Sequence, residues 1–120
     1  MDIPKIYESE YRFCEILWDH EPVSGKELVR LCNEKLEWKK STTYTVIRRL
    51  SDRGIIRSEN TIVTSLYSRQ EVQTAESTHV VETTFAGSLP GFVTAFVRGH
   101  KLSAKEVEEI QAIIDEYRAE

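Results

Sequence analysis

Residues 40–54 read KSTTYTVIRRLSDRG, and this stretch decides the fold. At about 100° per residue, its apolar side chains fall within one narrow arc of a helix. The arc comprises Thr43, Val46, Ile47 and Leu50. The opposite side carries Ser41, Thr45, Arg48 and Asp52, flanked by Tyr44 and Arg49. Gly54 follows, as glycine often does after the last turn of a helix. The pattern predicts a helix with a core face and a hydroxyl-rich, cationic outer face.

Two more helices are predicted before this stretch. Residues 8–19 place an apolar stripe at helical spacing, made of Phe13, Cys14, Leu17 and Trp18, and Pro22 ends this helix. Residues 25–37 repeat leucines at the same spacing, and Ser24 with Glu27 predicts a capping box at their start. Trp38 is expected to anchor the connection to the third helix.

A hairpin is predicted after the third helix. Two β-branched runs, residues 55–57 and 62–68, flank a polar tip at residues 58–61. Residues 1–70 therefore read as three helices and a hairpin, the winged form of the helix-turn-helix.

Residues 71–120 read as three modest amphipathic helices, separated at Gly87 and Ser88 and again at Ser103. Such short helices enclose little interior of their own, so their apolar faces are predicted to meet a second copy of the chain. The candidate dimerisation residues are Val81, Phe85, Leu89, Phe92, Val93, Phe96, Ile110, Ile113, Ile114 and Tyr117. The expected architecture is mainly α with a small β-hairpin: a winged-helix DNA-binding domain, residues 1–70, plus a helical dimerisation domain, residues 71–120.

The whole chain has 120 residues, with 16 Lys and Arg against 20 Asp and Glu. Its longest uncharged stretch, residues 83–97, is shorter than the roughly 20 apolar residues that a membrane-spanning helix needs. The N-terminus carries no apolar run of signal-peptide length, so a cytoplasmic location without membrane association is expected. Cys14 and Cys32 are then expected to be thiols buried in the core.

The net charge of −4 hides a segregation along the chain. Residues 26–57 hold nine basic and four acidic side chains, a balance of +5, whereas residues 1–25 and 71–120 have balances of −4 and −5. The basic block covers the predicted second and third helices and the start of the hairpin. Its position favours binding to nucleic acid, whose phosphates require a basic surface.

In a winged helix the third helix lies in the major groove of DNA. Arg48 can donate two hydrogen bonds to a guanine edge, and the hydroxyls of Ser41, Tyr44 and Thr45 suit base edges or phosphate. Phosphate contacts are expected from Lys39, Lys40 and Arg57. The predicted function is therefore binding to double-stranded DNA, with the third helix as the reading element.

One alternative is a dimeric winged-helix module that binds other proteins without sequence-specific DNA binding. Such a module would need an apolar outer face on the third helix, and this face is polar. An enzyme is not expected, because the sequence has no phosphate loop, nucleophile elbow or Ser/His/Asp arrangement. No cofactor or metal site is predicted, because His20, His79 and His100 lack ligands at suitable spacing.

The chain resembles the penicillinase-repressor family (BlaI, MecI and CopY) through ordered matches along its length. Residues 38–54 resemble the family pattern W-x-x-x-T-V-x-T-L-L-x-R-L-x-x-K-G, and shorter matches are Glu10-Tyr11, Leu17-Trp18, Tyr67-Ser68, residues 85–89, Ala95-Phe96 and residues 102–110. The resemblance implies a transcriptional repressor that binds a palindromic operator in double-stranded DNA as a homodimer. It also implies that Thr42, Thr45 and Arg49 occupy recognition-helix positions.

Three features depart from the family pattern. The wing, residues 58–64, has no Lys, Arg or Gly, whereas the family's wing often has a basic, Gly-containing tip. The cysteine cluster of the copper-responsive branch is missing, because no Cys follows Cys32. The β-lactam branch is inactivated by cleavage of an Asn-Phe bond, and the corresponding bond here is Ala95-Phe96. The resemblance therefore implies a regulatory protease that acts on the dimerisation domain as a partner, but this sequence does not have the family's Asn-Phe cleavage site.

Overall fold

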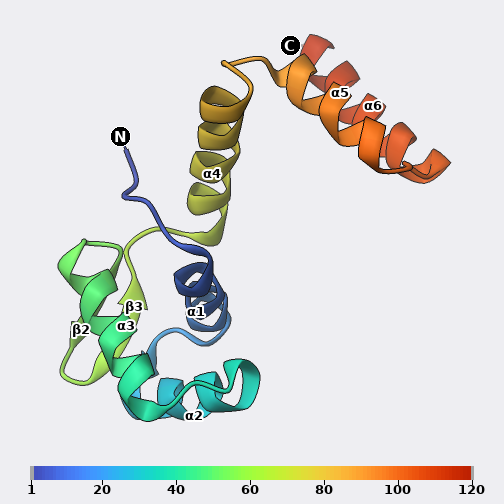
Figure 1. The fold of residues 1–120 in the computed structure, drawn as a ribbon. Helices are drawn as coiled ribbons and strands as arrows, with labels where there is room; N and C mark the ends of the chain where they lie inside the picture. Colours follow the sequence, from blue (N-terminus) through green and yellow to red (C-terminus); the bar gives the residue numbers. More distant parts are fainter. Residues whose placement is uncertain (1, 120) are drawn as a thin grey trace. The chain divides into compact units, whose positions relative to one another are not determined.

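The computed structural model describes residues 2–119, which form six helices and three short strands (Figure 1). The chain divides into two compact units after Ser77. The division falls inside helix α4 (Arg69–Thr84), whose first two turns belong to the first unit.

The first unit packs three helices around one core: α1 (Glu8–His20), α2 (Gly25–Leu36) and α3 (Lys40–Asp52). The fully buried side chains include Phe13, Leu17, Leu28 and Leu50. Trp38 stacks on Phe13 with ring centroids 6.3 Å apart. The three predicted helices and their buried faces are confirmed. At the start of α2, the Ser24 hydroxyl accepts a hydrogen bond from the Glu27 amide as predicted, but the Glu27 carboxylate pairs with Arg30.

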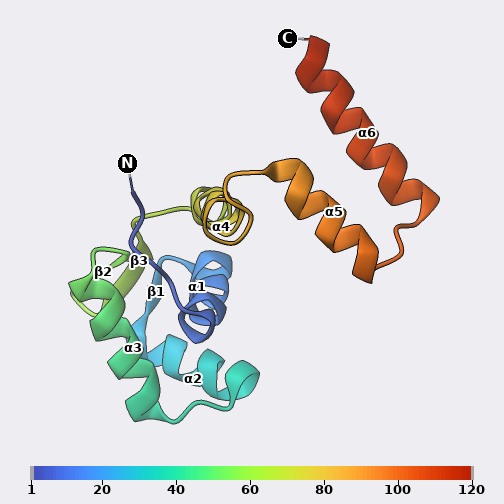
Figure 2. The same cartoon turned by 45° about the horizontal axis from the view of Figure 1, so that its top comes forward.

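The wing is a three-stranded antiparallel sheet in the order β1-β3-β2, and Figure 2 shows it beside α1 and α3. Its strands are β1 (Val23–Ser24), β2 (Ile56–Glu59) and β3 (Ile62–Ser65). The predicted hairpin exists, but its four-residue tip is wrong: Ser58 and Glu59 pair with Val63 and Ile62, which leaves a two-residue turn. The prediction also missed β1, because two residues are too few to give a strand pattern.

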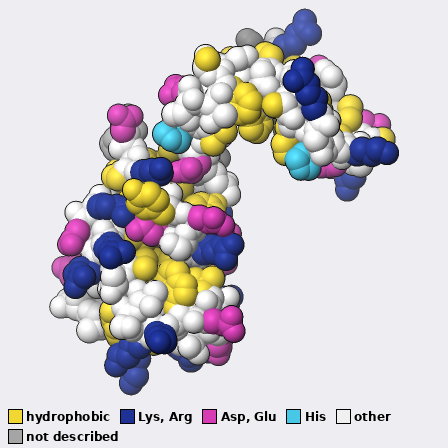
Figure 3. All heavy atoms as spheres, viewed as in Figure 1, with side chains coloured by type: hydrophobic (Ala, Val, Ile, Leu, Met, Phe, Trp, Pro, Cys, Tyr) yellow, Lys and Arg dark blue, Asp and Glu magenta, His cyan; other side chains and the backbone are white. Residues whose placement is uncertain are grey.

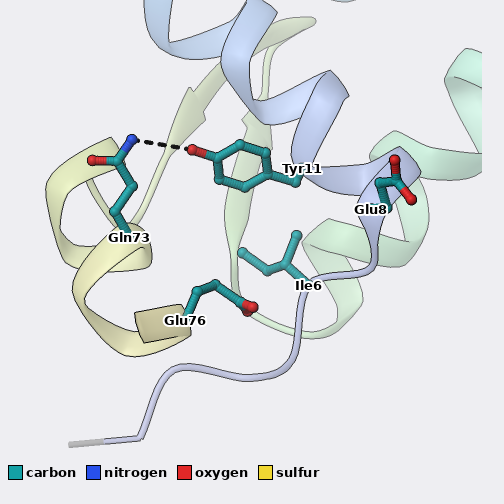
Figure 4. A pocket seen from close by; sticks show the side chains of 5 residues that line it. All are labelled: Ile6, Glu8, Tyr11, Gln73 and Glu76. Atoms are coloured by element: carbon teal, nitrogen blue, oxygen red, sulfur yellow. Dashed lines mark hydrogen bonds between the residues drawn. The ribbon is translucent and has the colours of Figure 1, made fainter. Parts of the chain in front are cut away.

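The first turns of α4 pack on α1. Val72 is buried, the Trp18 Nε1 donates to the Tyr67 carbonyl oxygen at 3.0 Å, and the Gln73 amide donates to the Tyr11 hydroxyl at 3.3 Å (Figure 4). An open pocket of about 410 Å³ lies beside this contact, lined by Ile6, Glu8, Tyr11, Gln73 and Glu76. These contacts attach α4 to the first unit by its N-terminal half.

The second unit contains the end of α4, α5 (Leu89–Gly99) and α6 (Ala104–Ala119). Ser88 caps α5 through the Gly91 amide, and Ser103 and Glu106 form the predicted capping box of α6. No residue of α5 or α6 is buried. Within residues 2–119, no single helix has the length and apolar composition to cross a membrane, and α4 and α5 meet that test only when taken together across the break between them.

Candidate nucleic-acid interface

Helix α3 presents a polar face to solvent and an apolar face to the core. Thr43, Val46, Ile47 and Leu50 are buried, as their spacing predicted. The opposite side chains of Ser41, Thr42, Arg48 and Arg49 are exposed, and that of Thr45 is half-buried. The outer surface of α3 therefore offers hydroxyl and guanidinium groups, and the exposed carboxylate of Asp52 lies in its last turn.

Five cations on or next to α3 form no ion pair in the described part of the chain. Among residues 2–119, none of them has a carboxylate oxygen within 4.0 Å. They are Lys39, Lys40, Arg48, Arg49 and Arg57, all exposed. In Figure 3, several Lys and Arg side chains lie over the side of the first unit where α3 and β2 run. Because these five cations outnumber the single carboxylate of α3, Asp52, and form no ion pair with the described residues, this surface attracts an external polyanion.

The start of α3 has unusual local chemistry. Lys39 occupies the N-cap with extended dihedral angles (φ −73°, ψ 156°), and it makes no side-chain capping hydrogen bond. The first turn contains no acidic residue. The exposed amides and the positive end of the helix dipole are thus joined by two ammonium groups, those of Lys39 and Lys40. This end of α3 is therefore positive and, among the described residues, has no side-chain acceptor of its own for the first amides.

Tyr44 joins α3 to the beginning of α2. Its ring lies against Gly25, where an added Cβ would stand 3.4 Å from Tyr44 Cε1. Tyr44 is 43% exposed, so part of the residue faces solvent beside the hydroxyls of α3. Packing on Gly25 therefore holds the ring while leaving one side of it available for contact.

Arg53, one of the nine basic side chains of residues 26–57, makes an internal contact. Its guanidinium donates to both carboxylate oxygens of Glu10, at 2.9 and 2.7 Å, and to the Lys5 carbonyl oxygen at 2.7 Å. Burial raises the pKa of Glu10, but hydrogen bonds from Arg53 and the Tyr7 amide outweigh it, and the net pKa is lowered. Sequence reasoning missed this pair because the partners are 43 residues apart.

The wing adds few groups that could bind DNA. Arg57 is exposed on β2, while the tip carries Glu59 and the turn residues Asn60 and Thr61. Both turn residues have left-handed φ values, 52° and 66°, typical of a type I′ hairpin turn. The Gly25 amide donates to the Thr61 carbonyl oxygen at 3.0 Å, so the turn is fixed to the start of α2.

Both cysteines are buried free thiols, as expected. Burial raises the pKa of Cys14 to about 12, and nearby Glu10 adds to the effect. Burial also raises the pKa of Cys32. Within the described residues, no group of three or more His, Cys, Asp or Glu side chains is placed to hold a metal ion.

The candidate dimerisation residues all lie in the second unit, and most of them are exposed. Val81, Phe85 and Phe92 are half-buried, and Phe85 meets Phe92 edge-on with ring centroids 5.4 Å apart. The other candidates are exposed: Leu89, Val93, Phe96, Ile110, Ile113, Ile114 and Tyr117. Exposed apolar side chains in this number are typical of a surface that another molecule covers.

The chain is similar to known proteins along nearly its full length. The family model of the penicillinase repressor matches residues 6–116. The penicillinase repressor of Bacillus licheniformis is 21% identical over 120 residues, covering 97% of this chain and 94% of that protein. The methicillin resistance regulatory protein MecI of Staphylococcus aureus (strain Mu50 / ATCC 700699) is 25% identical over 115 residues, covering 92% and 94%.

Part of the chain has the fold of a solved structure, a protein–DNA complex. It is the solution structure of monomeric BlaI from Bacillus licheniformis in complex with the blaP half-operator, with a TM-score of 0.51 and 20% sequence identity. The match covers 58% of this chain and 90% of that one.

Proposed function

The chain belongs to the penicillinase repressor family, and we propose that it is a transcriptional repressor that binds a palindromic operator in double-stranded DNA as a homodimer, with α3 in the major groove. The observation that carries the proposal is the outer face of α3, which is polar and whose arginines, Arg48 and Arg49, form no ion pair among residues 2–119. The solved BlaI complex, which has the same fold, contains a half-operator.

Two kinds of contact are expected at each half-site. Arg48 donates to a guanine edge, and a good bidentate pair discriminates between bases by about 1–3 kcal/mol. The hydroxyls of Ser41, Thr42, Tyr44 and Thr45 contact base edges or phosphates. Lys39, Lys40, Arg49 and Arg57 contact phosphates, which set affinity and register but carry no sequence preference.

The second unit supplies the dimer in this proposal. Covering its exposed apolar side chains with a second copy links two α3 helices, which then occupy successive major-groove faces and block polymerase. When one copy's first unit is bound, the link raises the effective concentration of the other copy's first unit at its half-site. A single first unit without this link therefore binds far more weakly. Any event that separates the two copies releases the operator, and cleavage near Ala95-Phe96 by a regulatory protease is one such event.

Selection of bound fragments from genomic DNA tests the proposal. The parent protein is expected to enrich an inverted repeat. Arg48→Ala is expected to relax the preference at one base pair of each half-site, and Thr45→Ala to alter a neighbouring position. Lys101→Gln, which removes a charge from the α5–α6 connection, serves as the control and should enrich the same repeat. If Arg48→Ala and Thr45→Ala both retain the parent's preference, α3 is not the element that reads DNA.

A further inference from the structure

The three residues before α1 are held against the C-terminal end of α3. Arg53, which directly follows α3, donates a hydrogen bond to the Lys5 carbonyl oxygen at 2.7 Å. The Tyr7 amide donates to the Glu10 carboxylate at 3.0 Å, and the same carboxylate pairs with Arg53. Glu10 is buried. The backbone on both sides of Ile6 is therefore fixed relative to α3, and Ile6 itself lies in the core.

This arrangement leaves the Lys5 side chain positioned and unneutralised. Its ammonium lies 5.1 Å from the centroid of the Tyr7 ring, and the Arg53 guanidinium lies 5.8 Å from the same centroid. The Arg53 charge is balanced by Glu10. In the part of the chain that the structure describes, no carboxylate oxygen lies within 4.0 Å of the Lys5 ammonium.

A second free cation lies at the same end of α3. Arg49 is one turn before Arg53, is exposed, and also has no carboxylate within 4.0 Å among residues 2–119. Lys5 and Arg49 therefore place two cations, unpaired within the described residues, at the C-terminal end of α3, against the one exposed carboxylate of Asp52, and Lys39 and Lys40 place two at its N-terminal end. The 13 residues of α3 span about 20 Å, more than the groove width of about 12 Å, so both ends of the helix come near phosphates when its middle meets bases.

We propose that Lys5 binds a DNA backbone phosphate at the C-terminal end of α3, so that the segment before α1 makes a contact that the tip of the wing, which has no cation, does not make. This inference rests on the proposed function. The Arg53–Glu10 pair acts as the support: it holds the Lys5 backbone, while the Tyr7 ring restricts where the ammonium goes. The contact adds affinity and salt dependence but no base preference.

The test measures binding of a fluorescently labelled duplex of mixed sequence, several helical turns long, as a function of salt concentration. Removing one phosphate contact lowers the slope of log affinity against log salt by about 0.9, hence by about 1.8 when both copies lose it. Lys5→Gln is thus expected to lose about 12-fold less affinity than the parent between about 50 and 200 mM salt. Lys5→Arg should keep the parent's slope, and Lys101→Gln, a matched loss of charge in the second unit, should also keep it.

The outcomes separate this contact from the function on which it rests. A parent protein without salt-dependent DNA binding would refute the proposed function and the Lys5 contact together. Normal binding by the parent, with a slope for Lys5→Gln equal to that of the parent, refutes only the Lys5 contact. A change in sequence preference in Lys5→Gln would also overturn the inference, because it would make Lys5 a base-reading residue.

Discussion

Replacing Lys39 by serine is expected to make the first unit more stable and the protein a weaker DNA binder. Lys39 already has the extended N-cap conformation, and a serine hydroxyl there would accept from the Thr42 amide. The Ser24 hydroxyl does this for the Glu27 amide at 3.0 Å. A serine N-cap is worth about 1 kcal/mol, which raises the melting temperature of a domain of this size by about 4–8 °C.

The same substitution removes a proposed phosphate contact from each copy. The slope of log affinity against log salt should fall by about 1.8 for a dimer. Lys39→Gln separates the two effects, because glutamine removes the charge without supplying a good cap. It should share the weaker binding and show little of the added stability.

Urea unfolding followed by tryptophan fluorescence measures the stability of the relevant unit. The chain has two tryptophans, Trp18 and Trp38, and both lie in the first unit. Equal midpoints for Lys39→Ser and Lys39→Gln would refute the capping argument. Parent-like salt slopes in both variants would instead remove Lys39 from the interface.

Four further outcomes follow from individual contacts. Because the pKa of Glu10 is lowered on folding, its ion pair stabilises the fold above the ordinary value of 4.5, and this contribution disappears as the pH falls through the lowered value. Glu10→Gln should therefore lower the free energy of unfolding by about 2 kcal/mol near neutral pH and by much less in acid. Urea unfolding at several pH values measures this difference, and a loss of stability that does not change with pH would contradict the pairing. Thr61→Gly should raise the free energy of unfolding by about 1 kcal/mol, because a β-branched residue there has a φ of 66°; a loss of stability would contradict the strain. Ile114→Asp should convert the dimer to a monomer in sedimentation at micromolar concentration, whereas the control Gln111→Asp should stay dimeric. If both variants stay dimeric, the apolar face of α6 that contains Ile114 is not the dimer interface. A thiol reagent at mildly alkaline pH should label Cys14, with its pKa of about 12, only at the rate of unfolding, and rapid labelling of the folded protein would be inconsistent with its burial.

Local patterns predicted the helices well, because each helix shows its buried face as a repeat in the sequence. The stripe from Thr43 to Leu50 is the clearest example, and all four of its residues are buried. The turn at Asn60-Thr61 was not predicted, because non-glycine residues rarely adopt left-handed conformations. It is formed by tertiary contacts: β1 pairs with β3, and the Gly25 amide bonds to Thr61. The sequence distance between Glu10 and Arg53 hid their pairing in the same way.

The beginning of α3 stands out among the helices of residues 2–119. Serine hydroxyls cap α2, α4, α5 and α6, and the Glu10 carboxylate accepts from the backbone at the start of α1. At α3 the N-cap is Lys39, and no side chain accepts from the first amides. A residue that is unfavourable for local stability, as Lys39 is at an N-cap, is expected where the position serves a function such as ligand binding. Phosphate oxygens would accept from these amides and pair with both ammonium groups, so DNA binding would complete the helix end that the chain itself leaves open. The same lysine that weakens the isolated fold would then strengthen the complex, which is why stability and affinity should change in opposite directions in Lys39→Ser.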